Sequence, residues 1–224
     1  MLENMTIKSK LLTLIVTALI ALAALGAATF YALNADKADM DEVGVVRLPS
    51  VVGLYQMQTN GINVRLNALT AAVYENDYHA QGKFADLLKR REELWGGYEK
   101  GFKIYEPLPQ TKEEEIAWKQ FLTEIADRQA EAKTAAYIER LSKNDDPKVQ
   151  QALFIDYFKS RDVAAPLFKK AMQTLDKIID LNIGYGNDAV KHSAVTASQV
   201  RTLVSAVIAI GMMSVAMILA VRPV

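Results

Sequence analysis

The sequence predicts an all-α protein, an antiparallel up-down-up-down four-helix bundle flanked by two transmembrane helices. Two observations carry this prediction. Apolar residues recur with the three- and four-residue spacing of a helix through most of the middle of the chain, and no alternating β pattern competes with them. Two long apolar runs without a charged residue lie on either side of that middle part.

The two apolar runs have the length of membrane spans. At a rise of ~1.5 Å per residue, residues 11–33 reach about 34 Å and residues 203–221 about 28 Å, against a bilayer core of ~30 Å. A cleaved signal peptide is the alternative for the first run, because Lys8 and Lys10 make a basic start and Gly26-Ala27-Ala28 offers small residues for cleavage. The run is longer than the ~7 to 15 residues of a signal-peptide core, so we expect an uncleaved anchor.

Basic residues predict the orientation and the domain boundaries. Lys8 and Lys10 precede the first run and Arg222 follows the second. Because basic residues beside a span favour the cytoplasmic side, we expect both of these flanking segments to lie in the cytoplasm. We therefore expect a cytoplasmic segment at 1–10, transmembrane helices at 11–33 and 203–221, and a periplasmic four-helix bundle at 34–202. Of the 26 basic and 26 acidic residues, only Glu3, Lys8, Lys10 and Arg222 lie outside that bundle. In a bacterium this arrangement places the chain in the inner membrane.

Four helices are expected between the two spans. The first continues from the first span, and Glu106-Pro107-Leu108-Pro109 ends the second. The third begins at a capping box of Thr111 and Glu114 and ends near Asn144-Asp145-Asp146-Pro147. The fourth runs into the second span. Whether residues 150–161 form its first part or a separate short helix stays open, since Pro166 could kink or restart it.

Each expected helix has an apolar seam at helical spacing. The first seam holds strict heptad spacing for about four heptads and is called the heptad stripe below. Its members are Val45, Leu48, Val52, Tyr55, Thr59, Ile62, Leu66, Leu69 and Val73. The second seam contains Trp95, Tyr98, Phe102 and Tyr105, aromatic side chains that could line a pocket or form the core.

The composition excludes several classes of function. The equal numbers of basic and acidic residues leave no basic excess for a general nucleic-acid binder, so we expect no nucleic-acid partner. The absence of cysteine excludes disulfides, thiolate zinc sites, iron–sulfur clusters and cysteine nucleophiles. Two histidines, His79 and His192, are too few for a multi-histidine metal site. We expect no cofactor and no metal.

Catalytic motifs are also missing from the sequence. It contains no GxSxG, GxxxxGK[ST], HExxH or GxGxxG pattern. Its paired acids, such as Glu114 with Glu115 or Asp145 with Asp146, fall at expected helix ends, where capping and the helix dipole explain them. We therefore do not expect an enzyme.

The chain has two spans around a helical domain, and the segment Met5-Thr6-Ile7-Lys8-Ser9-Lys10-Leu11 leads into the first span. This arrangement resembles the N-terminal part of a methyl-accepting chemotaxis protein with a four-helix-bundle ligand-binding domain. Leu48-Pro49-Ser50-Val51 and Asn63-Val64-Arg65-Leu66 resemble the first-helix pattern of that domain. Val221-Arg222-Pro223-Val224 is similar to the start of the HAMP relay that follows the second span in such receptors. Residues 222–224 would then begin a truncated HAMP-like relay.

The resemblance implies a transmembrane sensor that binds a small ligand, an organic acid or an amino acid, outside the cytoplasm. It also implies contact with membrane lipid, a homodimer, and cytoplasmic signalling partners reached only through a missing C-terminal region. Histidine kinases and cyclases use similar sensor halves, so the output module stays open. A membrane scaffold that binds a partner protein without sensing is the competing class of function. Whether the ligand binds directly or through a periplasmic binding protein also stays open.

In this family, residues of the first and last helices hold ligands near the membrane-distal end, sometimes across a dimer interface. Arg65 lies about 20 Å below the expected turn at Tyr78, at ~1.5 Å per residue. On the other expected helices, basic or polar side chains fall at about the same level of the bundle as Arg65. The candidate ligand-binding residues are Arg65, Arg91, Arg128, Lys169 and Thr174.

Arg91 and Arg128 interrupt apolar seams, and Arg65 flanks the heptad stripe. A buried guanidinium needs an anionic partner, and a carboxylate ligand held by two hydrogen bonds would supply one. The alternative is that nearby acids such as Glu131 neutralise these arginines, or that their long stems cover apolar surface while the charged heads reach water. The sequence alone leaves both interpretations open.

Overall fold

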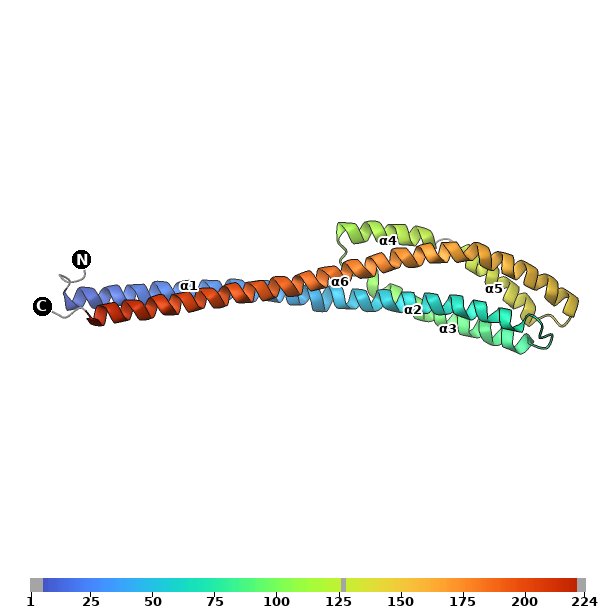
Figure 1. Cartoon of the computed structure of the whole chain (residues 1–224), viewed down its shortest axis with the longest axis horizontal. Helices are drawn as coiled ribbons and strands as arrows, with labels where there is room; N and C mark the ends of the chain where they lie inside the picture. Colours follow the sequence, from blue (N-terminus) through green and yellow to red (C-terminus); the bar gives the residue numbers. More distant parts are fainter. Residues whose placement is uncertain (1–5, 126–127, 221–224) are drawn as a thin grey trace. The chain divides into compact units, whose positions relative to one another are not determined.

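The computed structural model describes residues 6–125 and 128–220, and within these ranges the chain is helical and contains no strand. In order, the helices are α1 (Ile7–Asp41), the π-helix η1 (Glu42–Arg47), α2 (Leu48–Thr70), the 3-10 helix η2 (Ala71–Tyr74), α3 (Gln81–Tyr105), α4 (Lys112–Ile125), α5 (Arg128–Ser142) and α6 (Pro147–Ala220) (Figure 1). The predicted all-α class is confirmed.

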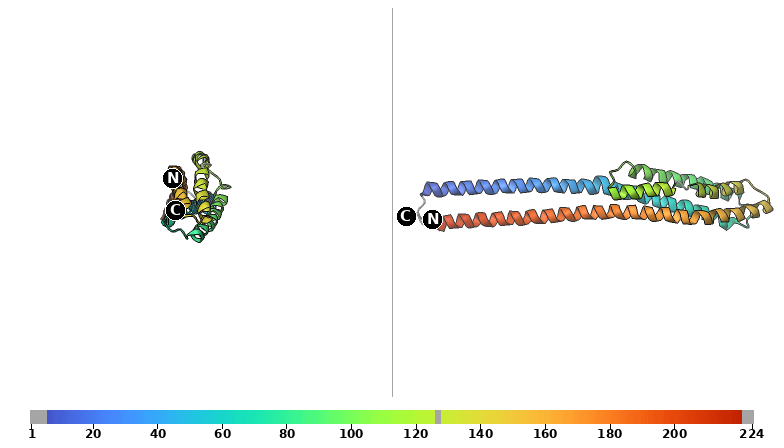
Figure 2. Two further views of the ribbon diagram at one scale, coloured as in Figure 1. Left: turned by 90° about the vertical axis from the view of Figure 1, so that its right-hand side faces the viewer. Right: turned by 90° about the horizontal axis from the view of Figure 1, so that it is seen from above.

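The chain forms two compact units. One consists of residues 1–43 and 187–224, and the other, called the bundle below, of Gly44–Gly186. In the first unit α1 and the C-terminal part of α6 lie side by side and antiparallel (Figure 2). His192 Nδ1 lies 2.7 Å from Asp39 Oδ2, and Ser193 donates a hydrogen bond to Asp36. By length and composition, both helices are apolar enough to cross a membrane.

The helix ends follow the signals in the sequence. The backbone N–H of Glu114 donates to Thr111 Oγ1 at 3.3 Å, and the N–H of Thr111 donates to Glu114 Oε2 at 2.8 Å, so the predicted capping box is present. Residues 150–161 form the early part of α6, which passes Pro166 without ending. The stretch expected to be one third helix contains two, α4 and α5; residues 126 and 127 between them lie outside the described ranges.

The bundle has two apolar clusters. One contains Leu54 and Met57 of α2 with aromatic rings of α3 and α4 and the stretch 171–179 of α6. The other contains Ala68 and Ala71 with Phe84, α5 and the stretch 153–157 of α6. Along α2 the two clusters are therefore separated by residues 58–67, about 15 Å at ~1.5 Å per residue.

α2 and α3 approach each other closely at the first cluster. A Cβ atom added to Gly101 would lie 2.5 Å from the carbonyl oxygen of Gly53 and 2.9 Å from the backbone nitrogen of Met57. Only a residue without a side chain fits between two backbones at this distance. Gly101 thus fixes how tightly α2 and α3 pack at this level.

The heptad stripe lies on the surface of the bundle. Its larger members Val45, Leu48, Val52, Tyr55, Ile62, Leu66 and Val73 are 41 to 77% exposed. The face of α2 that is buried instead carries Leu54, Met57, Gly61, Val64 and Ala68. Small residues on this second face let α3 and α6 come close, which explains why the less apolar face is the buried one.

Candidate functional site

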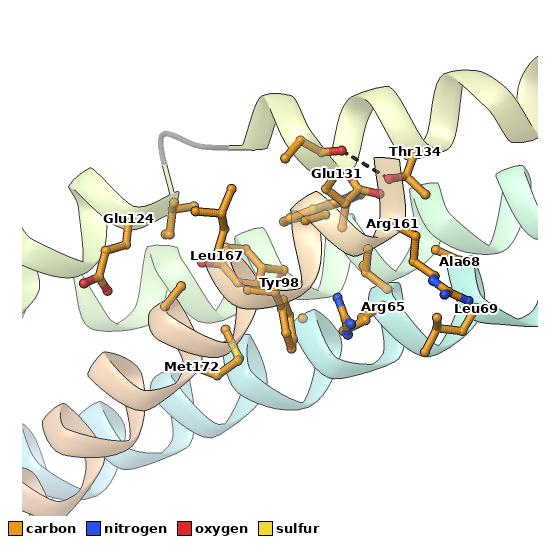
Figure 3. A pocket seen from close by; sticks show the side chains of 18 residues that line it. Arg65, Ala68, Leu69, Tyr98, Glu124, Glu131, Thr134, Arg161, Leu167 and Met172 are labelled. Atoms are coloured by element: carbon orange, nitrogen blue, oxygen red, sulfur yellow. Dashed lines mark hydrogen bonds between the residues drawn. The ribbon is translucent and has the colours of Figure 1, made fainter. Parts of the chain in front are cut away.

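A cavity lies inside the bundle, at the level between the two apolar clusters (Figure 3). Five helices line it: α2, α3, α4, α5 and α6. Its wall is mostly apolar, with Val64, Leu69, Trp95, Ile125, Leu167 and Met172 among the contributing residues. The polar groups of the wall come from Arg65, Tyr98, Glu124, Glu131, Thr134 and Arg161. An apolar pocket with a few convergent polar groups is the usual form of a small-molecule site.

The size of the cavity restricts what it can hold. Its volume is about 100 Å³. Pockets for drug-sized ligands measure ~300 to 1,000 Å³, whereas a cavity of ~150 Å³ accommodates benzene. The site therefore suits a small solute.

Arg65 extends from α2 into the wall of the cavity and is half-buried. Its guanidinium carbon lies 5.3 Å from the centre of the Phe168 ring, so the cation stacks on an aromatic face. No carboxylate of the described part of the chain pairs with it. A half-buried guanidinium without an acidic partner keeps a large part of its capacity to bind an anion.

Arg161 of α6 brings a second cation to the cavity (Figure 3). Its Nη2 donates to Oδ1 of Asp162 at 2.8 Å, and its guanidinium carbon lies 5.0 Å from the Phe158 ring centre. The Arg161 side chain is 32% exposed and that of Asp162 69% exposed. Water screens a pair of this kind, so Asp162 neutralises Arg161 only in part.

Glu131 of α5 also lines the cavity, but Arg91 of α3 satisfies it. Arg91 Nε donates to Oε1 at 2.7 Å and Nη2 to Oε2 at 2.5 Å, a bidentate pair. This hydrogen bonding with Glu131 raises the pKa of Arg91 above its usual value. Arg91 therefore has an acidic partner within the protein, which Arg65 lacks among the described residues.

Two of the remaining predicted site residues, Lys169 and Thr174, do not line the cavity. Lys169 is exposed and does not line the cavity. Thr174 is buried against α4, where its hydroxyl donates to Lys170 O at 3.3 Å and accepts from Gln120 Nε2 at 3.4 Å. Arg128 begins α5, and its side chain lies outside the described part of the structure. Of the aromatic residues named from the sequence, Trp95 and Tyr98 line the cavity.

Sequence reasoning missed Arg161, Phe168 and Glu124 as cavity residues. Arg161 and Phe168 fall on one face of α6 with Ala164, Ala171 and Met172, so extending the helical spacing backwards from Leu175 would have found them. Glu124 lies one residue before the end of α4, and nothing in its sequence surroundings distinguishes it from the other acids of that helix.

A second buried polar cluster in the bundle, called the polar node here, consists of Arg47, Glu114 and Asn182. Arg47 Nη1 donates to the two carboxylate oxygens of Glu114 at 2.9 and 2.8 Å and to Asn182 Oδ1 at 3.1 Å. Arg47 is 5% exposed, and the other two residues are fully buried. Burial is the larger cause that raises the pKa of the neighbouring Tyr105 phenol, and the negative charge of the Glu114 carboxylate raises it further. The residues of the node satisfy one another with hydrogen bonds, and none of the three lines the cavity described above.

The family model of the Tar ligand-binding domain homologues matches residues 1–160. No curated protein and no solved structure matches the chain. The matched range covers α1 to α5 and the start of α6, and so includes Arg65 and most of the helices around the cavity. The family is one of chemoreceptor sensory domains and not of enzymes. The chain thus belongs to the Tar ligand-binding domain homologues, the helical ligand-binding domains of chemoreceptors, and carries two helices with the length and apolar character of membrane spans.

Proposed function

We propose that the chain is the sensory module of a transmembrane chemoreceptor, and that it binds a small carboxylate-bearing solute in the cavity of the bundle. The bundle lies in the periplasm between transmembrane helices at 11–33 and 203–221, and ligand binding is passed across the membrane. The observation that carries the ligand class is Arg65, a half-buried cation in the cavity wall without a carboxylate partner among the described residues.

A carboxylate completes this site chemically. Two parallel N–H groups of a guanidinium match the two oxygens of a carboxylate, and the low dielectric of the apolar wall strengthens the pair. Arg161 adds positive charge from the adjacent helix. Arg91 stays with Glu131 and shapes the wall without contacting the ligand. Ligand binding then shifts the equilibrium between two conformations of the receptor, by an amount set by the difference in the ligand's affinity for them.

Calorimetry on the full chain in lipid nanodiscs, with a panel of small mono- and dicarboxylates, tests the ligand class. We expect saturable binding by at least one acid, and a loss of about 30-fold or more in Arg65→Ala, because the ligand carboxylate loses its buried partner. Arg90→Ala is the matched control: Arg90 is exposed on α3 and pairs only with Glu93 among the described residues. Absence of binding by every acid, together with tight binding of another protein, would instead support a scaffold.

The heptad stripe supports a homodimer. A row of exposed apolar side chains with three- and four-residue spacing is the pattern by which two parallel helices pack knobs into holes. A second copy of α2 has the complementary stripe, so a two-fold axis along α2 would bury both. Arg65 follows directly after Asn63-Val64 and next to Leu66 of the stripe, so this interface would run beside the cavity.

Cysteine chemistry tests the dimer and the periplasmic location in a chain that has no native cysteine. Val52→Cys and Ile62→Cys are expected to form disulfide-linked dimers in membranes, whereas Lys100→Cys, exposed on α3, is not. In intact cells, a membrane-impermeant thiol reagent should label Lys100→Cys. Labelling only after lysis would place the bundle in the cytoplasm and contradict the proposed topology.

A further inference from the structure

A π-helical segment, η1, lies between α1 and α2. It covers Glu42–Arg47, and the bundle begins within it at Gly44. In a π-helix each backbone hydrogen bond joins residues five apart instead of four, so the turn holds one residue more than an α-helical turn. Such segments are rare and are frequently found at functional sites.

The sequence explains why this turn is wide. In a continuous α-helix the N–H at position 49 would bond to the carbonyl of Val45, but Pro49 has no N–H and its ring clashes with that carbonyl. Gly44, inside η1, is of a residue type that only proline exceeds in destabilising an α-helix. Two local features therefore disfavour the α-helical form of this turn and leave the π-helical form.

The C-terminal end of η1 is fixed in the bundle. Arg47, its last residue, is 5% exposed and donates hydrogen bonds to Glu114 of α4 and Asn182 of α6. The carbonyl oxygen of Val46 accepts from the hydroxyl of Ser50 at 2.7 Å. A change in the hydrogen-bond pattern of η1 would therefore move the chain on its other side, which is α1.

Two polar contacts show which face of α1 meets α6 within their own unit. Ser193 donates a hydrogen bond to Asp36, and His192 Nδ1 lies 2.7 Å from Asp39 Oδ2. If η1 became α-helical, its turn would lose the extra residue. The helix before it would then rotate about its own axis by about 100°, the angle of one residue at ~3.6 residues per turn.

We propose that η1 is a conformational switch that sets which face of α1 lies against α6. In the π form, Asp36 and Asp39 face α6. In the α form, the next residues along the chain, Lys37 and Met40, take their places; both are exposed in the π form. The switch requires no ligand in the cavity, so it holds or fails independently of the proposed function.

Cysteine cross-linking between α1 and α6 tests the switch in the full chain, which has no native cysteine. Asp36→Cys with Ser193→Cys reports the π form, and Lys37→Cys with Ser193→Cys reports the α form. After mild oxidation in membranes, gel mobility separates the intramolecular disulfide from linked dimers. We expect the first pair to give the dominant product and the second pair a minor one.

Pro49→Ala removes the obstacle to the α form, so the ratio of the two products should shift towards the Lys37 pair by about tenfold or more. Gly44→Ala, a milder change that keeps the proline, should shift the ratio in the same direction by about threefold. Pro166→Ala is the matched control, because Pro166 also lies inside a helix of the bundle, and it should leave the ratio unchanged.

A deletion makes the test reversible. Removing Gly44 from the Pro49→Ala chain takes out one residue, so a continuous α-helix would again bring Asp36 opposite Ser193, and the ratio should return to its original value. A Cβ atom at Gly44 would have no atom within 4 Å, so the deletion removes no packing contact of a side chain.

Three results would overturn the switch. The first is dominance of the Lys37 pair in the chain that retains Pro49 and Gly44. The second is a ratio that Pro49→Ala leaves unchanged, and the third is a shift that the deletion of Gly44 fails to reverse. If Pro49→Ala gives neither product because the helix pair no longer forms, the ratio in Gly44→Ala decides in the same way.

Discussion

The polar node and the cavity both contain an arginine stacked on an aromatic ring, but only one of these arginines is neutralised. The guanidinium carbon of Arg47 lies 4.9 Å from the Tyr185 ring centre, and that of Arg65 lies 5.3 Å from the Phe168 ring centre. Arg47 also holds both oxygens of Glu114, whereas Arg65 has no carboxylate partner in the described ranges. Burial of an arginine therefore does not distinguish the two places; the absence of a carboxylate partner at Arg65, within the described ranges, and its position beside a cavity do.

The largest effect is expected at the polar node. Arg47→Met leaves Glu114 buried without its cation, so the free energy of unfolding should fall by about 3 to 5 kcal/mol. Urea unfolding of the full chain in detergent, followed by circular dichroism, measures the change. Arg65→Met should cost less than about 1 kcal/mol, because no internal ion pair is lost.

A double variant sharpens this result. In Arg47→Met with Glu114→Leu no charge of the polar node remains buried, and most of the lost stability should return. Equal destabilisation by Arg47→Met and Arg65→Met would mean that the two arginines do not differ in the way the structure indicates.

Two glycines of the bundle should respond in opposite directions. Gly101→Ala places a Cβ against the backbone of α2 and should destabilise the chain by about 1 to 3 kcal/mol. At Gly61, which borders the cavity, the added Cβ would lie 3.6 Å from Met172 Cε, an ordinary contact. Gly61→Ala should therefore raise the stability by up to about 1 kcal/mol. Thermal melts of both variants distinguish the outcomes, and a stabilised Gly101→Ala would contradict the close approach of α2 and α3.

Filling the cavity should remove binding without harming the fold. Ala164→Leu adds apolar volume to the wall, so ligand affinity should drop by about tenfold while the melting temperature stays constant or rises. Ala132→Leu, at an exposed position of α5, is the control and should change neither quantity. Unchanged affinity in Ala164→Leu would show that the ligand binds somewhere else.

The smallest effect concerns alkaline pH and the surroundings of the polar node. Burial raises the pKa of Tyr105 above that of a free phenol, so above about pH 10 the unfolded chain loses this proton while the folded chain keeps it. The folded state then binds more protons, and its stability falls as the pH rises, by about 1 kcal/mol between about pH 10 and pH 11. Unfolding curves at these pH values should show a weaker dependence in Tyr105→Phe.

The sequence predicted the helices and their ends well, because these depend on neighbouring residues. The capping box at Thr111 and Glu114, the stop after Tyr105 and the two apolar spans all involve short stretches. Arg65 could be singled out because it is a lone charge beside two apolar stripes of one helix. The structure places it in the cavity wall, and its role as a ligand contact stays a prediction.

The pairing of charges across helices could not be predicted in the same way. Periodicity names the faces of a helix but not which face is buried, and α2 buries the face with the small residues Gly61 and Ala68 while exposing the more apolar heptad stripe. That Arg91 meets Glu131 and Arg65 meets no carboxylate in the described ranges depends on the rotation of separate helices about their axes. A single sequence carries no signal for this rotation.

The long-range character of the polar node has a consequence for folding kinetics. Its hydrogen bonds join Arg47 to residues 67 and 135 positions away, so each of them requires two helices that are distant in sequence to come together, and the complete node requires three. Closing such loops costs chain entropy that is recovered only when the contacts form, so we expect these contacts to form late in folding. We expect φ-values near zero for Arg47, Glu114 and Asn182, so that substitutions there accelerate unfolding and leave the folding rate almost unchanged.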